Sequence, residues 1–516
     1  MKDLAPSVLE ELKRKKDKAL GQGGPERVKR QHDKGRLTAR ERIDCMLDPG
    51  TFVEFGLLAC SDMPGMEERS AADGLIIGYG LINGRQIGII ANDFTVLASS
   101  NARIYTKKAK QMRDEVEKRG FPLVWLGESG GGRLPDIQGA RGIVSLAASG
   151  ERSVFSQYSH IRKTPWITAI MGQCNGVPTW QACLADFVVQ VKGSTLSVAG
   201  ARALKRVIAA NYSDEDMGGW KIHAEITGIA DQVAEDEKDC FRIIKEFLDY
   251  MPSNNKELSP RRPVPKGSGK DMGHILDILP EKRTRAYDMY KIIKTMVDGG
   301  KIFDLKPFFG KTVITCLARI DGRVVGLIAS QPMVNGGAMN TDALDKMTSF
   351  MCLCDSFNVP LIFLHDTPGF LVGKEAELKR VGAKVTNALG ALAQVTVPKI
   401  SIIIRKSYGQ AAANMCGPGT GPDFIVAWPT GESGFLDPDT AADVAYGNLP
   451  EKEREALKKE MVKDSKLYPL AQGYYLQDII DPRDTRDYII QALNIIRDSA
   501  TCGIGKHLLA NWPTKF

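Results

Sequence analysis

The chain has 516 residues, of which 43% are hydrophobic and 25% are charged, and its formal net charge is +7. This length exceeds what one hydrophobic core supports and predicts two to four domains, while the composition excludes disordered and fibrous classes. The longest apolar runs, such as ISIII at 400–404, are far shorter than the roughly 20 residues that a membrane-spanning helix needs.

The N-terminal segment is charged from its second residue and carries much of the basic excess, in KRKKDK at 13–18 and RVKRQHDKGR at 27–36. It lacks the apolar core of a signal peptide, so we expect a cytoplasmic protein, or one of the mitochondrial matrix in a eukaryote, without membrane insertion. We interpret the segment as a solvated helical arm. The interleaved aromatic residues that favour nucleic-acid binding are lacking, so we expect no nucleic-acid partner.

Cysteine and histidine follow no disulfide or metal-binding pattern. The ten cysteines include no C-x-x-C motif and are expected to be reduced thiols. The sequence also predicts no metal site, because the six histidines are scattered. They are His32, His160, His223, His274, His365 and His507.

In chain order, the first half alternates apolar strands with helices. A strand is predicted over 83–92 and a helix over 101–120, followed by strands that begin after Pro122 and Pro165. Such alternation predicts an α/β fold with a mainly parallel sheet. A segment rich in Pro, Ser, Asn and Gly at 251–271 then predicts a linker.

The second half repeats the first. NGRQIGIIAN at 83–92 and DGRVVGLIAS at 321–330 share Gly, Arg, Gly, Ile and Ala at the same places, 238 residues apart. Pro122 and Pro360 have the same separation, and two later landmarks follow in the same order with separations of 233 and 237 residues. The sequence therefore predicts a tandem duplication of one α/β domain.

Each copy has two strands that end in turns of small residues and run into helices. The turns are GESGGGR at 127–133 and GQCNGVPTW at 172–180, then HDTPGF at 365–370 and KSYGQAAAN at 406–414. Small residues let a substrate approach the backbone, and a helix N-terminus offers unpaired N–H groups to developing negative charge. Because the turns are matched in both copies, we expect oxyanion holes rather than tight turns alone.

No complete set of side chains for acid–base catalysis accompanies these turns. GESGGG is similar to the sequence around a serine-peptidase nucleophile, which would make Ser129 the nucleophile. However, the only histidine before it is His32 in the charged arm, and the α/β pattern does not fit that barrel. Oxyanion holes without a base favour enolate chemistry in which another partner removes the proton.

Longer motifs, in order along the whole chain, resemble one family. They include KGRLTARERIDCMLDPGTFVE at 34–54, ANDFTVLASSNA at 91–102, ESGGGR at 128–133, DTPGFLVG at 366–373 and AWPT at 427–430. With these residues the chain resembles the carboxyltransferase β subunits of biotin-dependent acyl-CoA carboxylases, and the propionyl-CoA carboxylase type most of all. Sodium-pumping acyl-CoA decarboxylases share this subunit type.

The resemblance implies two tandem crotonase-like (ClpP/crotonase) α/β domains, with CoA bound mainly by the first, 1–260, and biotin by the second, 261–516. It implies a hexamer, with each site between the first domain of one subunit and the second of another. Separate biotin carboxylase and biotin carboxyl carrier subunits would load and deliver the biotin. Carboxybiotin would release CO2, and its ureido anion would take the α-proton of the acyl-CoA, so the missing base would belong to the cofactor.

Matched by position, the resemblance assigns catalysis to backbone N–H groups at two turns. The first pair would hold the thioester enolate and the second the ureido oxygen of biotin. The four donors are Gly176, Val177, Gln410 and Ala411. The residues expected to line the substrate are Gly130, Gly131, Gly132, Gly409 and Ala413.

The chain departs from the family pattern at both turns. Members usually have Gly-Gly-Ala, whereas this chain has GVP at 176–178 and GQA at 409–411, so the approach to the donors is tighter. Pro178 has no N–H to donate. Asp437 also stands where Gly is usual.

Substrate choice is expected to differ from that of a propionyl-CoA enzyme. In the family, the residue that matches Ala413 helps to set acyl size, and Asp there accompanies short acyl groups. Here Ala412 and Ala413 replace Tyr and Asp, and each further buried methylene of substrate contributes about 0.8 kcal/mol. We expect a longer, branched or aromatic acyl group, unless Gln410 or Phe435 refills the space.

Three functions stay open at this point. The first is carboxylation of an acyl-CoA within a biotin complex. The second is decarboxylation of a dicarboxylic acyl-CoA, coupled to a membrane partner and using the same residues. The third is a non-catalytic scaffold within a hexamer, which the altered turns suggest. Co-purifying subunits separate the first two, and turnover with free biotin excludes the third.

Overall fold

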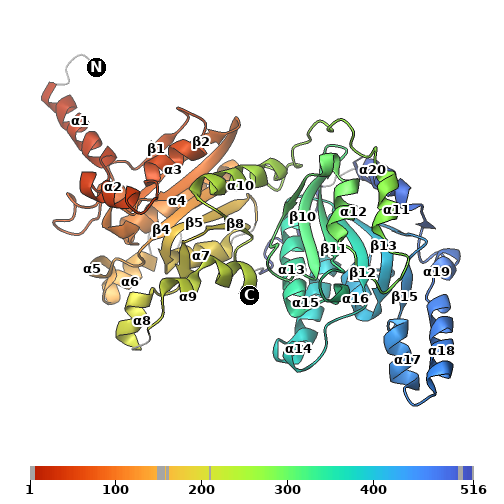
Figure 1. Cartoon of the computed structure of the whole chain (residues 1–516). Helices are drawn as coiled ribbons and strands as arrows, with labels where there is room; N and C mark the ends of the chain where they lie inside the picture. The colour runs from red at the N-terminus through yellow and green to blue at the C-terminus, as the bar shows by residue number, and fades with distance from the viewer. Residues whose placement is uncertain (1–5, 148–156, 159–161, 209–210, 498–503, 514–516) are drawn as a thin grey trace. The chain divides into compact units, whose positions relative to one another are not determined.

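The computed structural model describes residues 6–147, 157–158, 162–208, 211–497 and 504–513. Contacts divide the chain into two compact units, Met1–Leu248 and Asp249–Thr514. Each unit holds one mostly parallel sheet (Figure 1), and the two sheets have the same strand order. The tandem α/β duplication is therefore confirmed, whereas the division of binding roles at residue 260 stays a prediction.

The sheet of the first unit follows the order β1-β2-β3-β4-β5-β6-β8, with β7 beside β5. Neighbours along β1, β2 and β3 are antiparallel, and all later pairs are parallel. The strands are β1 (Val53–Phe55), β2 (Leu75–Ile82), β3 (Arg85–Asn92), β4 (Leu123–Ser129), β5 (Trp166–Asn175), β6 (Phe187–Val191), β7 (Thr195–Ser197) and β8 (Gln232–Ala234).

The sheet of the second unit repeats this path as β9-β10-β11-β12-β13-β14-β16, with β15 beside β13. The register repeats too, since Gly88 lies opposite Leu123 in the first sheet and Gly326 opposite Leu361 in the second. The strands are β9 (Ile302–Asp304), β10 (Val313–Ile320), β11 (Arg323–Ser330), β12 (Leu361–Thr367), β13 (Lys399–Tyr408), β14 (Phe424–Ala427), β15 (Glu432–Gly434) and β16 (Asp478–Ile479).

In both units helices precede the first strand and alternate with the later ones. Those of the first unit are α1 (Pro6–Leu20), α2 (Pro25–His32), α3 (Ala39–Met46), α4 (Arg103–Arg119), α5 (Leu134–Ile137), α6 (Ala140–Ala147), α7 (Val177–Leu184), α8 (Ala201–Val207), α9 (Asp214–Gly218) and α10 (Glu237–Tyr250). Those of the second are α11 (Ile275–Ile278), α12 (Met289–Met296), α13 (Thr341–Ser356), α14 (Lys374–Leu378), α15 (Val381–Gln394), α16 (Gly409–Asn414), α17 (Pro438–Tyr446), α18 (Glu451–Asp464), α19 (Tyr468–Gln472) and α20 (Thr485–Arg497).

Apolar residues at helical spacing attach the helices to the sheets. On α4, the buried Tyr105, Met112 and Val116 pack on Leu123 and Trp125 of β4. In the second unit, α11, α12 and α20 share one core with the sheet (Figure 1). These contacts fix where each strand ends relative to the helix that follows it, which is where the predicted turns lie.

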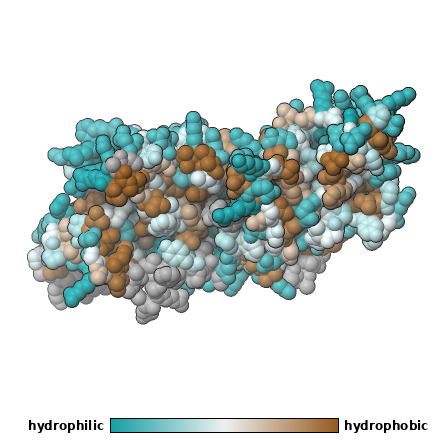
Figure 2. Space-filling view, turned by 90° about the horizontal axis from the view of Figure 1, so that it is seen from below, coloured by the Kyte–Doolittle hydropathy of each residue, from teal (hydrophilic) through white to brown (hydrophobic). Residues whose placement is uncertain are grey.

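The hydropathy of the helices and of the surface can be compared with what a membrane-spanning helix requires. None of the described helices is long and apolar enough to cross a bilayer. Figure 2 shows hydrophobic residues in separate patches among hydrophilic ones on the face in view.

Candidate active site

The Gly130–Gly132 turn follows β4 and lies beside strained backbone. Leu97, Ala98 and Ser99 all have left-handed backbones, with φ of 51°, 53° and 45°. The N–H of Gly130 donates to the carbonyl of Ala98 at 2.8 Å, and Gly131 has φ of 103°. Left-handed backbone at residues other than glycine costs energy and clusters at functional sites.

The second unit repeats this arrangement 238 residues later. Asn335, Gly336 and Gly337 have φ of 47°, 63° and 82°, and Gly369 has φ of 140°. The N–H of Met339 donates to the carbonyl of Gly369 at 3.0 Å. In the first unit the N–H of Asn101 donates to the carbonyl of Gly131 in the same way. Both units therefore hold the turn after the fourth strand against an equivalent left-handed segment, which is strained in the first unit and built mostly of glycine in the second.

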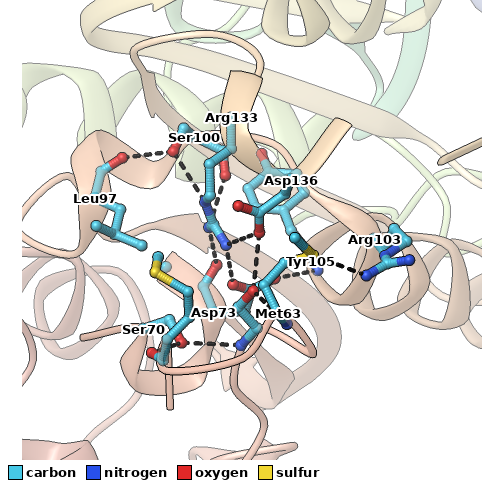
Figure 3. A network of polar contacts seen from close by, with 12 residues as sticks. Met63, Ser70, Asp73, Leu97, Ser100, Arg103, Tyr105, Arg133 and Asp136 are labelled. Atoms are coloured by element: carbon cyan, nitrogen blue, oxygen red, sulfur yellow. Dashed lines mark hydrogen bonds and ion pairs between the residues drawn. The ribbon is translucent and has the colours of Figure 1, made fainter. Parts of the chain in front are cut away.

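Arg133, directly after the glycine turn, fixes the position of that turn (Figure 3). Its Nη1 donates to Asp73 Oδ1 at 2.5 Å and to Asp136 Oδ2 at 3.2 Å, and its Nη2 donates to the Ser100 carbonyl at 2.9 Å. Burial raises the pKa of Asp73, although the charge of Arg133 acts in the opposite direction. The turn is thus tied through one buried guanidinium to two other segments.

Glu128, the residue before Ser129, is a second anchor. Its carboxylate is fully buried beside the bulge of β4 and receives Gln31 Nε2 at 2.7 Å, Arg36 Nη1 at 2.9 Å and Arg42 Nη2 at 2.7 Å. The interpretation of the N-terminal segment as a solvated arm is therefore wrong for Gln31 and Arg36, whereas most other residues of 27–36 are exposed as expected. Charge patterning cannot reveal this, because the partner carboxylate lies on a strand far along the sequence.

Asp366 is the matching anchor of the second unit. It is fully buried at the bulge of β12 and receives Arg405 Nε at 2.9 Å and the Lys406 N–H at 3.2 Å. Burial raises its pKa, whereas Arg405 acts to lower it. The same carboxylate position is thus used in both copies, with an arginine from a different element.

At the second turn of the first unit, Gly176 begins the passage from β5 into α7. Its φ is 70°, and its N–H donates to the Ser197 carbonyl at 3.0 Å. Pro178 has no N–H, and among the described residues no acceptor lies against the N–H of Val177. A Cβ on Gly176 would lie 3.9 Å from Gly131 Cα, so the two predicted turns meet.

In the second unit, Gly409 begins α16 with φ of 57°, and a Cβ there would lie 3.0 Å from the Phe435 carbonyl. The N–H groups of Gln410 and Ala411 follow, and no acceptor among the described residues lies against them. The Ala411 side chain is fully buried, and Ala413 is half-buried. The predicted donors of this turn therefore lie together at the start of one helix.

Asp437, where the family usually has Gly, has a structural role here. It caps α17 by accepting the Asp439 N–H at 3.1 Å. It also accepts Arg283 Nη2 at 2.8 Å and Lys406 Nζ at 3.1 Å. The departure is thus explained by an ion-pair cluster that supports the end of β13.

Neither of the two described side chains considered for catalysis, His365 as a base and Ser129 as a nucleophile, is placed for that role. His365 is fully buried between Ser401 and Ser407, and burial lowers its pKa to about 3. Ser129 is buried and donates to the Ser99 carbonyl at 2.8 Å, which does not suit a nucleophile. His160 lies outside the described residues, and within them no group of His, Cys, Asp or Glu is placed to hold a metal ion.

A cavity of about 200 Å³ lies beside Val177 within the first unit. Its walls come from α4, β4, α6 and α7, and they include Tyr105, Arg113, Trp125 and Trp180. None of these four residues was predicted from the sequence as part of a site. Arg113 and Trp180 lie on helix faces that resemble ordinary amphipathic patterns, so only the packing of the helices reveals the cavity.

Comparisons with known proteins agree with this architecture. A family model described as the carboxyl transferase domain matches residues 30–506. Methylmalonyl-CoA decarboxylase subunit alpha of Propionigenium modestum is 32% identical over 511 residues, which cover 96% of this chain and 96% of that protein. The mitochondrial propionyl-CoA carboxylase beta chain of Homo sapiens is 33% identical over 508 residues, with 95% and 91% covered.

The structural comparison points the same way. Transcarboxylase 12S, solved as a hexamer assembly with methylmalonyl-coenzyme A bound, aligns with a TM-score of 0.88 and 30% identity over 96% of both chains. The chain therefore belongs to the carboxyl transferase family. It is a carboxyltransferase with tandem crotonase-like domains, as the resemblance implied.

Proposed function

We propose that this chain transfers a carboxyl group between biotin and the α-carbon of an acyl-CoA thioester. The first unit holds the CoA thioester and the second holds biotin. The observation that carries this proposal is the pair of strand-to-helix turns, one in each repeat, where backbone N–H groups have no protein acceptor among the described residues. Two such turns match two oxygens that gain negative charge in one reaction.

The first turn acts on the thioester. The Val177 N–H, at the start of α7, donates to the thioester oxygen, and the helix N-terminus favours the enolate charge. The Gly176 N–H is used by Ser197, so Val177 is the donor that we assign at this turn. The neighbouring Gly130–Gly132 turn leaves room for the thioester to approach, because glycine has no side chain.

The second turn fits biotin. The N–H groups of Gln410 and Ala411 would hold its ureido oxygen, and the side chain of Phe435, which is 86% exposed next to Gly409, offers an apolar surface for its ring system. Bound biotin supplies both the carboxyl group and the nitrogen that acts as base. Ala412 and Ala413 are half-buried beside this turn, and the acyl size that they admit stays a prediction.

Free biotin tests this function. The purified chain should decarboxylate a malonyl-type acyl-CoA only when biotin is added, as followed by loss of the dicarboxylic thioester in chromatography. Biotin-dependent turnover contradicts the scaffold hypothesis. No turnover with any acyl-CoA, from a protein that still binds CoA thioesters, would contradict the proposed function.

Decarboxylation in the cell is the second candidate, because the relatives include decarboxylase alpha subunits of Propionigenium modestum and Veillonella parvula. The direction of transfer does not depend on the residues described above. It depends on the partner that delivers or accepts biotin. Purification of the native complex therefore decides between a biotin carboxylase subunit and a membrane decarboxylase subunit.

We further propose an oligomer, a hexamer as in the transcarboxylase 12S assembly, in which a site combines the first unit of one subunit with the second of another. Co-expressed Val177→Pro and Ala411→Pro subunits should then recover part of the activity, because some sites combine two intact halves. Differently tagged subunits allow the mixed oligomer to be isolated and assayed. Activity no higher than that of the single variants, in a mixed oligomer, would contradict shared sites.

A further inference from the structure

The cavity beside Val177 is lined by a buried arginine, Arg113, that forms no ion pair within the described residues. The Arg113 side chain is 5% exposed and lines the cavity. In the part of the chain that the structure describes, no carboxylate or carbonyl accepts a hydrogen bond from its guanidinium. Asp114, the next residue, forms its ion pair with Lys110 instead.

Other buried arginines of this chain are paired. Arg42 contacts Glu128 and Glu237, Arg133 contacts Asp73, and Arg405 contacts Asp366. Burial lowers the pKa of Arg113 to about 10, so it is still cationic at neutral pH. Burying a charge without a partner is unfavourable, and a ligand carboxylate that pairs with the guanidinium would offset that cost.

The remaining walls of the cavity are mostly apolar and aromatic. Tyr105, Trp125 and Trp180 supply rings, and Ile143 of α6 supplies an aliphatic side chain. An apolar cavity of about 150 Å³ holds a benzene ring, and this one measures about 200 Å³. It therefore has room for an extended or aromatic group together with one carboxylate.

We propose that this cavity receives the acyl group of the substrate, and that the group ends in a carboxylate, remote from the thioester, that pairs with Arg113. The inference rests on the proposed function, since Val177 lines the same cavity and would hold the thioester oxygen at its mouth. A planar guanidinium donates two parallel hydrogen bonds to a carboxylate, which selects strongly against a neutral acyl end.

Binding of matched thioesters to the purified full chain tests this inference without any carboxyl transfer. The pairs are adipyl-CoA with hexanoyl-CoA and suberyl-CoA with octanoyl-CoA, which differ in the terminal carboxylate. By calorimetry, at least one ω-carboxy thioester should bind tenfold or more tightly than its neutral partner. Equal affinities within both pairs would overturn the inference, and this comparison needs no variant.

Arg113→Met then assigns the discrimination to one residue. The variant should lose the preference for the ω-carboxy thioester while binding the neutral thioester as before, and Arg113→Lys should keep part of it. Arg119→Met, on the exposed side of the same helix, is the matched control and should change neither affinity. An unchanged preference in Arg113→Met would overturn the inference. Biotin-dependent turnover, measured separately, decides the proposed function.

Discussion

Val177→Pro and Ala411→Pro are each expected to lower kcat about a hundredfold or more, the usual effect of losing one oxyanion donor. Each change removes one backbone N–H that we assign to a reacting oxygen. Val177 is the first residue of α7, and Ala411 lies in the first turn of α16. Neither N–H makes a bond within its helix, so proline removes no helical hydrogen bond at either position. Biotin-dependent decarboxylation of the acyl-CoA is the measurement.

Variants that keep the N–H separate this effect from a change of shape. Val177→Ala and Gln410→Ala should retain most of the activity, and thermal unfolding should place all four variants near the wild type. Gly176 does not suit this test, since its φ of 70° excludes proline and its N–H already donates to Ser197. Proline variants with more than half of the wild-type kcat would show that catalysis does not use these donors.

Arg42→Ala is expected to lower the free energy of unfolding by about 3–5 kcal/mol, as when one partner of a buried ion pair is removed. Arg42 is 1% exposed and joins Glu128 at 2.7 Å to Glu237 at 2.6 Å. Burial alone would lower the pKa of Arg42, but these two carboxylates hold it above its ordinary value. Without Arg42, two carboxylates lose a buried counter-charge. Urea titration followed by circular dichroism measures the loss.

Lys29→Ala is the matched control on the same N-terminal segment. Lys29 pairs with Asp33 at 2.9 Å, but its side chain is 73% exposed, so its loss should cost about 0.5 kcal/mol or less. If Arg42→Ala were no more destabilising than Lys29→Ala, the cluster around Glu128 would not hold the glycine turn in place. A large loss confined to Arg42→Ala supports its role as an anchor.

The sequence by itself determined the duplicated α/β fold and the location of the turns. Strands such as 83–92 and 321–330 consist of apolar, β-branched residues in a recurring order, so their repetition is visible without any contact. Gly131, Gly176 and Gly409 were identifiable because a left-handed or crowded backbone favours glycine at fixed places in a turn. Strand patterns and turn glycines depend on residues that are neighbours in the chain, so the sequence alone can show them.

The tertiary structure alone decided which groups at those turns are engaged and which are open. The Ser197 carbonyl accepts the Gly176 N–H, and Asp437 pairs with Arg283 and Lys406. Arg113 lines a cavity and forms no ion pair within the described residues. Each of these facts depends on segments that are distant in sequence and meet only when helices pack on a sheet. Hydrogen bonds and ion pairs form at contact distance, and sequence spacing does not specify which distant groups reach it.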